Sequence, residues 1–178
     1  RNGKFRPYRG SIKDRISIEE RPEIVDKRLR IGDWEVDSVI GKLNKSSLVT
    51  LVERVSRYTI ILKVNSKEAQ VVAKAIVERA KEMKLTMHTI TGDNGTEFAE
   101  HRHIAQELDI DFFFTHPYSS WEKGTNENTN GLLRQYFPKG TDFNIISDDT
   151  ISTVENELNN RPRKCLNYKS PIEIFNTN

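Results

Sequence analysis

Two aspartates occupy positions where a carboxylate could do chemistry. Asp37 lies within residues 33–41, whose alternation of side chains has the period of a β-strand. An unpaired carboxylate buried in a sheet is costly, so a compensating cation is expected there. Asp93 lies in a Gly-Asp-Asn-Gly turn after an apolar stretch, and ligands of open α/β sheets gather where strands end. Two such carboxylates predict a site for a hard divalent cation, which prefers oxygen ligands.

A third acidic residue, Glu127, lies in the polar first half of a predicted helix. On that helix Glu127, Gly131 and Arg134 share one face, because they are spaced at i, i+4 and i+7. A glycine inside a helix costs about 1 kcal/mol relative to alanine, which predicts a close approach of Gly131 to a backbone or a ligand. We therefore expect Glu127 to face the sheet, although a solvent-facing glutamate is the commoner case.

Other interpretations compete for the two aspartates. Asp33 and Glu35 lie on the same strand face as Asp37, which is favoured because it lies deeper in the apolar part of the strand. Asp93 taken alone could be an ordinary Asx-turn residue. The metal-site interpretation therefore depends on all three carboxylates meeting in the fold.

Polar and basic residues around Glu127 predict contacts with DNA. The candidates near the helix N-terminus, whose dipole favours anions, are Lys123, Asn126, Asn130 and Arg134. A solvated polar helix face is the alternative. Trp121 and Tyr118 could stack on a base, but packing against the core is the expected role. The basic residues of the RPRK stretch, 161–164, could touch DNA or stabilise a helix C-terminus.

The remaining patterns predict the elements that must position these residues. Predicted strands cover residues 33–41, 48–54, 58–64, 87–91 and 111–115. Predicted helices run from a cap at Ser66 to about Lys84, over 97–108 and 125–137, and from a cap at Ser147 or Asp148 to before Pro162. The first three strands suggest an antiparallel meander. The whole order predicts an α/β fold, a mixed five-stranded sheet with helices on both faces.

Composition narrows the class of protein. Of the 178 residues, 35% are hydrophobic and 30% charged, which is typical of a globular protein. No apolar run approaches the length of a membrane helix, so no membrane segment is expected. The single cysteine, Cys165, excludes an internal disulfide, and a small buried filler is its expected role.

The charge is unevenly distributed along the chain. The net charge is +2, but residues 1–15 contain six basic residues and one acidic residue. This stretch predicts an extended basic arm suited to DNA phosphates, or a solvated linker. We expect residues 1–30 to be an arm or linker from a missing DNA-binding domain, and residues 31–178 to form the catalytic core.

Ordered motifs carry a family resemblance. They are WEVD at 34–37, TGDNGTEF at 91–98, HPYSSWEKGTNENTNGLLR at 116–134 and NNRPRKCLNYKSP at 159–171. Together they resemble the transposases of bacterial insertion sequences, closest to the insertion sequence thirty family, over nearly all of residues 16–175. Members of that family are similar to retroviral integrases in their core. The resemblance therefore implies a ribonuclease-H-like fold with an Asp-Asp-Glu triad.

The resemblance also implies a site and a chemistry. The family motifs place the triad on Asp37, Asp93 and Glu127, with 33 residues between the last two, and the family's basic residue two turns after the glutamate matches Arg134. The implied cofactor is a pair of Mg²⁺ ions, for which Mn²⁺ can substitute. One ion would activate water or a DNA 3′ hydroxyl, and the other would stabilise the leaving oxygen.

The implied function is DNA transposition, with cleavage at the ends of an element followed by joining of the 3′ hydroxyl to another DNA phosphate. Expected partners are the terminal inverted repeats, target DNA and at least one further copy of the chain when two ends are held together. The expected location is cytoplasmic, at the nucleoid. Two alternatives remain: a ribonuclease-H-like nuclease that only hydrolyses, and an inactive DNA-binding or regulatory fragment. The GTNENTN motif and the basic arm favour the transposase.

Overall fold

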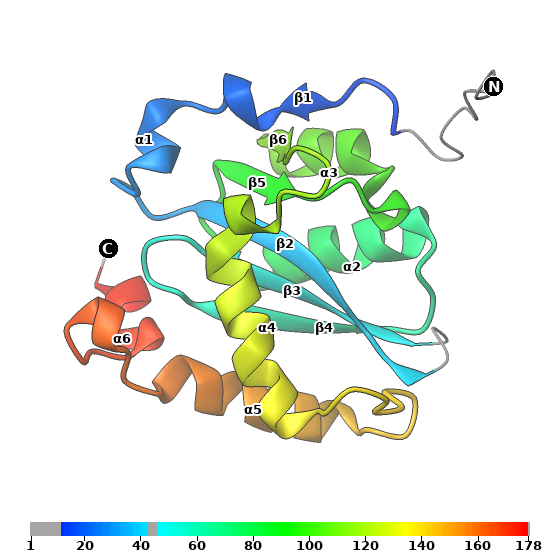
Figure 1. The fold of residues 1–178 in the computed structure, drawn as a ribbon, viewed down its shortest axis with the longest axis vertical. Coiled ribbons are helices and arrows are strands. Elements are labelled where there is room, and N and C mark those ends of the chain that lie inside the picture. Colours follow the sequence, from blue (N-terminus) through cyan, green and yellow to red (C-terminus); the bar gives the residue numbers. More distant parts are fainter. Residues whose placement is uncertain (1–11, 43–45, 178) are drawn as a thin grey trace, which may run out of the picture.

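The computed structural model describes residues 12–42 and 46–177. Six strands form one mixed sheet in the order β1-β6-β5-β2-β3-β4 (Figure 1). The strands are β1 (Ile16–Ser17), β2 (Asp33–Ile40), β3 (Ser47–Glu53), β4 (Thr59–Val64), β5 (Thr89–Gly92) and β6 (Asp111–Phe114). Strands β2, β3 and β4 are antiparallel neighbours, whereas β5 runs parallel to both β2 and β6. The five predicted strands and the antiparallel meander are confirmed.

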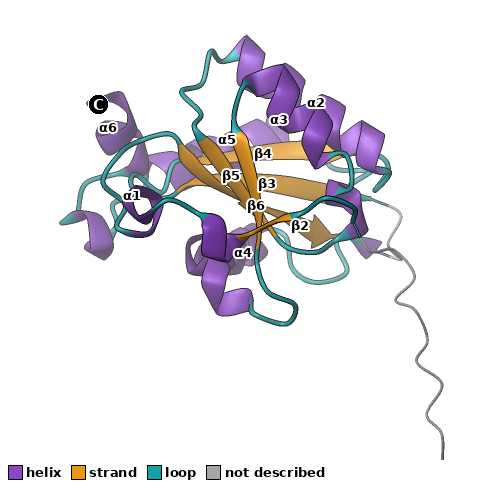
Figure 2. Ribbon diagram, turned by 90° about the horizontal axis from the view of Figure 1, so that it is seen from above, coloured by secondary structure: helices purple, strands orange, loops and turns teal. Residues whose placement is uncertain are grey.

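Helices cover both faces of this sheet, as predicted. They are α1 (Glu23–Asp26), α2 (Ala69–Glu82), α3 (His101–Leu108), α4 (Gly124–Tyr136), α5 (Asp148–Asn160) and α6 (Pro171–Asn176). Helices α2 and α3 lie over one face, and α4 lies across the other (Figure 2). Helix α5 packs on the same side as α4, since both contribute to one apolar core.

The alternation along the strands divides the apolar side chains between two cores. Val49 and Ile60 belong to the larger core, which α2 and α3 cover. Their neighbours Leu48 and Ile61 point to the opposite face and pack against α4 and α5. Because successive strand residues face opposite sides, continuously apolar strands indicate a sheet buried on both faces. A carboxylate on β2 therefore needs either a charged or hydrogen-bonding partner or access to solvent.

Two predicted helix starts have different outcomes. Helix α2 begins at Ala69, and its N-cap is Glu68 rather than Ser66, so the predicted cap was wrong by two residues. The Ser66 hydroxyl instead accepts a hydrogen bond from the Glu68 backbone N–H at 3.1 Å. The prediction for α5 is confirmed, because the Ser147 hydroxyl accepts from the Thr150 N–H at 3.1 Å.

The sheet extends into the predicted N-terminal arm. Residues 1–11 lie outside the described part of the chain, but Ile16 pairs with Phe113 as β1 joins the edge of β6. Ile12 is buried in the larger core. Part of the stretch predicted as an arm thus belongs to the sheet, and its two strand residues are too few to show the period of a strand. The division of the chain at residue 30 stays a prediction. No helix in the described residues is long and apolar enough to cross a membrane.

Candidate active site

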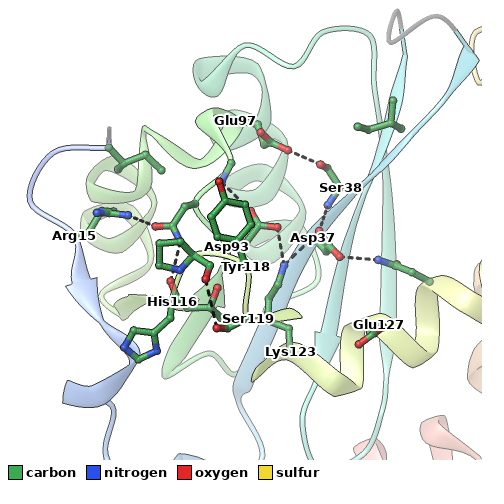
Figure 3. A pocket seen from close by; sticks show the side chains of 17 residues that line it. Arg15, Asp37, Ser38, Asp93, Glu97, His116, Tyr118, Ser119, Lys123 and Glu127 are labelled. Carbon is green, nitrogen blue, oxygen red and sulfur yellow. Dashed lines mark hydrogen bonds and ion pairs between the residues drawn. The ribbon is translucent and has the colours of Figure 1, made fainter. Parts of the chain in front are cut away.

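A pocket of about 830 Å³ opens beside β2, β5 and the first half of α4. Its lining includes the three predicted triad residues, Asp37, Asp93 and Glu127. Figure 3 shows Asp37 on β2, Asp93 just after β5 and Glu127 on α4, with Lys123 at the start of that helix. Residues that are 34 to 90 positions apart in the sequence thus meet around one cavity.

Strand register explains why the two aspartates meet. Strands β2 and β5 are parallel, and Glu35 is the partner of Thr91. Asp37 and Asp93 each follow two residues later, so they lie side by side at the carboxyl end of the parallel-paired stretch, with Asp37 still inside β2 and Asp93 just after β5. This end is the carboxyl edge of the parallel pair, where ligands of α/β sheets usually bind.

The two aspartates converge on one cation, the ammonium of Lys123. Its Nζ lies 3.3 Å from Asp37 Oδ1 and 3.1 Å from Asp93 Oδ2, and it donates to the Val36 carbonyl at 3.0 Å. The Lys123 side chain is only 5% exposed, whereas those of Asp37 and Asp93 are 26% and 41% exposed. Burial raises the pKa of Asp37 and the nearby Asp93 raises it further, while Lys123 opposes both effects. The site therefore binds positive charge, and its carboxylates remain open to solvent.

These residues suit a divalent cation in chemistry, because hard ions bind carboxylate oxygens. Lys123 Nζ lies between the two carboxylates, so its ammonium would have to withdraw for a metal ion to bind both. In the described residues no three His, Cys, Asp or Glu side chains are close enough to hold a metal as they stand. Asp37 and Asp93 thus form a pair of carboxylates that are already close together.

Glu127 lines the same pocket as the two aspartates, although its side chain does not lie as predicted. Its side chain is exposed on the pocket wall, so the expectation that it faces the sheet was wrong. No backbone approaches Gly131, which is exposed and has nothing within 4 Å of a Cβ built on it. That half of the prediction was wrong, and the approach of a ligand stays a prediction. Glu127 nevertheless follows Lys123 by one helical turn, which puts both on the face of α4 that borders the pocket. An exposed glutamate has the rotamer freedom to turn toward the aspartates.

A second polar cluster lies behind the pocket and holds α4 in place. We call Glu35, Arg54, Thr50 and Asn126 the closed cluster. Glu35 pairs with Arg54 at 2.6 Å and also accepts from the backbone N–H of Asn126 at 2.8 Å. Glu35 is completely buried, and its partner Arg54 is 4% exposed. Sequence reasoning missed this cluster, which fixes the first turn of α4 and hence Lys123 and Glu127.

The structure separates Asp37 from its two rivals on β2. Glu35 belongs to the closed cluster, and Asp33 is 1% exposed and bound to Arg30 and Thr89. Neither lines the pocket. Only Asp37 of the three combines a cation partner with access to solvent.

The four residues predicted to contact DNA differ in their burial and in their partners. Asn126 was wrongly expected at the surface, because it is completely buried and its amide bonds to Thr50. Lys123 is engaged by the two aspartates, and Asn130 donates to Asp37 Oδ2 at 2.9 Å. Arg134 donates to the Ile40 carbonyl at 2.9 Å, and it remains partly exposed. Three of the four are therefore tied to the architecture of the site.

Three expectations about packing were also wrong. Trp121 and Tyr118 are 72% and 87% exposed rather than packed against the core. Cys165 is exposed rather than a buried filler. The segment from Tyr118 to Trp121 therefore displays two large aromatic rings to solvent.

Further residues of the pocket were not predicted. Glu97 lines it and accepts a hydrogen bond from the Ser38 hydroxyl, next to Asp37 (Figure 3). The signal was present, because Glu97 lies within the TGDNGTEF motif and four residues after Asp93. On the pocket rim, His116 Nδ1 lies 2.8 Å from Glu122 Oε1, and this hydrogen bond raises the pKa of His116.

Comparisons with known proteins agree with this arrangement. The chain is 52% identical to the transposase of insertion sequence element IS4351 from Bacteroides fragilis, over 94% of the chain and 51% of that protein. It is 42% identical to transposase InsI of element IS30C from Escherichia coli K12, over 89% of the chain and 41% of that protein. The chain thus spans about half the length of the curated relatives it matches. The predicted resemblance to insertion-sequence transposases is confirmed.

Solved structures and a family model define the fold. The crystal structure of the catalytic core domain of BIV integrase superposes with a TM-score of 0.60 at 21% identity, over 82% of this chain and 93% of that one. The predicted ribonuclease-H-like fold is therefore confirmed. The model of the integrase core domain matches residues 29–120, which include Asp37 and Asp93. On this match, which spans more than half of the sequence, the chain belongs to the integrase core domain family.

Proposed function

We propose that this chain is the catalytic part of a DNA transposase that cleaves element ends and joins the resulting 3′ hydroxyl to target DNA. One observation carries the proposal: Asp37 and Asp93 converge on a single buried cation, the ammonium of Lys123, just beyond the parallel-paired stretch of β2 and β5. The integrase core family and the transposase relatives support the same reaction class.

Asp37, Asp93 and Glu127 are the proposed ligands of two divalent cations, Mg²⁺ or Mn²⁺. Such cations, when bound, lower the pKa of a nucleophilic water or hydroxyl and neutralise charge on the leaving oxygen. The protein's own contribution is positioning, since phosphoryl transfer requires little else from side chains. Asn130 orients Asp37 through its hydrogen bond to Oδ2, and the closed cluster fixes the helix that carries Glu127.

Lys123 has a distinct part in this proposal. Its ammonium neutralises the charge of Asp37 and Asp93 and keeps the two carboxylates close together. Without a cation between them, the two carboxylates would repel each other. A divalent cation held by Asp37 and Asp93 would take the place of this ammonium, and Lys123 could then donate to a DNA phosphate beside the pocket. Arg134 and the exposed ring of Trp121 are further proposed contacts for DNA.

DNA as substrate implies further partners. Holding two element ends together requires two active sites, so we propose at least a dimer of the chain when DNA is bound. We also propose that the protein works at the bacterial nucleoid.

A cleavage and joining assay tests the proposal. Short duplexes with candidate element ends are incubated with the purified chain and Mn²⁺, and nicked and joined products are separated by denaturing electrophoresis. Asp93→Asn and Glu127→Gln should each lose at least about 10²-fold in rate, the scale for removing one electrostatic contact to a transition state. Glu78→Gln, on the exposed surface of α2, is the matched control and should retain activity.

The same assay distinguishes the alternatives. Nicked products without joined products would indicate a nuclease that only hydrolyses. Binding of DNA with no product from the wild type would indicate an inactive DNA-binding fragment. Full activity of Asp93→Asn would remove the proposed site.

A further inference from the structure

A second cavity lies on the other side of α4 from the catalytic pocket. It has a volume of about 240 Å³ and is lined by Arg28, Arg57, Arg163, Cys165 and the first turns of α4. We call it the arginine pocket. Its walls come from the segment after α1, the β3–β4 turn and the segment between α5 and α6, which lie together on one side of α4 (Figure 1).

The three arginines carry charge that no carboxylate balances. No acidic side chain lines the cavity, and within the described residues none of the three forms an ion pair with a carboxylate. Instead, Arg28 and Arg57 donate to the Arg54 carbonyl at 3.1 and 2.8 Å, and Arg163 donates to the Leu158 carbonyl at 2.9 Å. These bonds hold the guanidinium groups in place without neutralising them.

Donor capacity remains after these bonds are formed. A guanidinium has five N–H donors in a fixed planar fork, and the bonds to carbonyls occupy only part of each. The Nε of Arg163 is buried and has no hydrogen-bond partner among residues 12–42 and 46–177. Burial and the nearby Arg161 both lower the pKa of Arg163, while Cys165 and Tyr136 oppose them. An anion with several acceptor oxygens would accept hydrogen bonds from the remaining N–H donors and would also balance the positive charge of the arginines.

The start of helix α4 adds to the positive electrostatic potential of the arginine pocket. Helix α4 has 13 residues, its N-cap residue makes no side-chain capping bond, and its first residues, Gly124 and Thr125, line the cavity. The partial positive charge of a helix N-terminus favours anions. The helix is therefore a shared wall, with carboxylates on one side and arginines on the other.

We propose that the arginine pocket binds a phosphate of the DNA backbone and so anchors the duplex beside the catalytic pocket. The inference rests on the proposed function for the identity of the ligand as DNA. Bidentate arginine forks match phosphate geometry, and backbone contacts of this kind fix the register of a protein on DNA. One rigid helix then sets the distance from the anchored phosphate to the reacting one.

Cys165 makes the proposal directly testable. It is the only cysteine of the chain, and it is exposed on the wall of the arginine pocket. Its rate of alkylation by N-ethylmaleimide, a neutral reagent, reports occupancy of the pocket without any catalytic step. A short duplex without metal should slow alkylation several-fold. Inorganic phosphate should protect only at much higher phosphate concentration, which separates a DNA anchor from a site for free phosphate.

Variants of the arginines give a second measurement. Binding of the duplex is followed by fluorescence anisotropy between low and moderate salt. Arg28→Gln and Arg163→Gln should each weaken binding and make the slope of log K against log salt shallower by about 0.9 for each DNA phosphate that the variant no longer neutralises. Lys74→Gln, with the same charge change on the exposed face of α2, is the control. Arg163→Lys keeps the charge, and if that variant folds it should retain the slope better than Arg163→Gln.

The outcomes separate this inference from the proposed function. Unchanged alkylation and an unchanged salt slope in the arginine variants would overturn the arginine pocket, even if the chain cleaves and joins DNA. An equally weakened affinity in Lys74→Gln would overturn it as well. Protection of Cys165 together with shallower slopes, in a chain that never cleaves DNA, would support the anchor and remove the transposase.

Discussion

Glu35 and Asp37 lie two residues apart on the same face of β2, but they differ in burial and in the partners of their carboxylates. Glu35 is completely buried, and Arg54 and a helix N–H satisfy both of its carboxylate oxygens. Asp37 is partly exposed and shares one cation with Asp93. A charge with matched partners and no solvent access is structural. A surplus of carboxylates at an opening is suited to chemistry.

The two regions depend on each other. The closed cluster fixes the first turn of α4, and that turn carries Lys123 and Glu127 into the pocket. Buried charge is expensive unless it is fully paired, so the closed cluster tolerates little change. The open pocket must tolerate exchange of one cation for another. Substitutions in each region test this contrast, and the largest effect is expected in the closed cluster.

Breaking the closed cluster should cost the most stability. In Glu35→Ala the buried guanidinium of Arg54 loses its partner, and the free energy of unfolding should fall by about 3–5 kcal/mol. Urea denaturation measures the loss. The control is Glu23→Ala, which removes an exposed pair with Lys27 and should change stability by less than about 1 kcal/mol. Equal effects of the two substitutions would contradict a structural role for the buried pair.

Removing the cation of the open pocket should have an intermediate effect. Lys123→Met leaves Asp37 and Asp93 without their shared counterion, and the exposure of both carboxylates limits the expected loss to about 1–2 kcal/mol. The rise in melting temperature on addition of Mn²⁺ should become larger than in the wild type, because the competing ammonium is gone. Differential scanning fluorimetry with and without Mn²⁺ measures both changes.

Lys74→Met on α2 is the control for this substitution and should leave the response to Mn²⁺ unchanged. A smaller response in Lys123→Met than in the wild type would show that Lys123 helps to hold the metal rather than competing with it.

The rim of the pocket should show the smallest effect. His116 has a raised pKa, chiefly because Glu122 accepts its ring N–H and attracts its positive charge. The folded protein therefore holds this proton more tightly than the unfolded chain does. The stabilisation is complete below the ordinary value of 6.5 and is lost as pH rises through the raised pKa. A titration of the His116 ring by NMR should give a pKa above 6.5 that falls in Glu122→Gln. No fall in that variant would show that Glu122 is not the cause.

Local patterns were enough for much of this architecture. The alternation of side chains along consecutive residues identified β2. The Gly-Asp-Asn-Gly turn after β5 identified Asp93 as a residue at the end of a strand. Ser147 could be recognised as a cap because its partner, Thr150, is three residues away. Each of these features depends on neighbours within a few residues, whose geometry the backbone repeats.

Partners remote in the sequence could not be predicted in this way. Arg54 meets Glu35 through strand pairing, and Asn126 reaches Glu35 across 91 residues. Glu127 is exposed, and Lys123 meets both aspartates, because of the way α4 packs across the sheet. The periodicity of the local sequence does not predict this packing.

The sequence by itself determined which residues could bind metal, which segments became strands, and that Asp37 would lie within a strand and Asp93 just after one, because residue chemistry and backbone period are local properties. Only the tertiary structure decided that Glu35 is an anchor and Asp37 a ligand candidate. The same strand period gives both residues the same orientation. Helix packing alone buries one and leaves the other open.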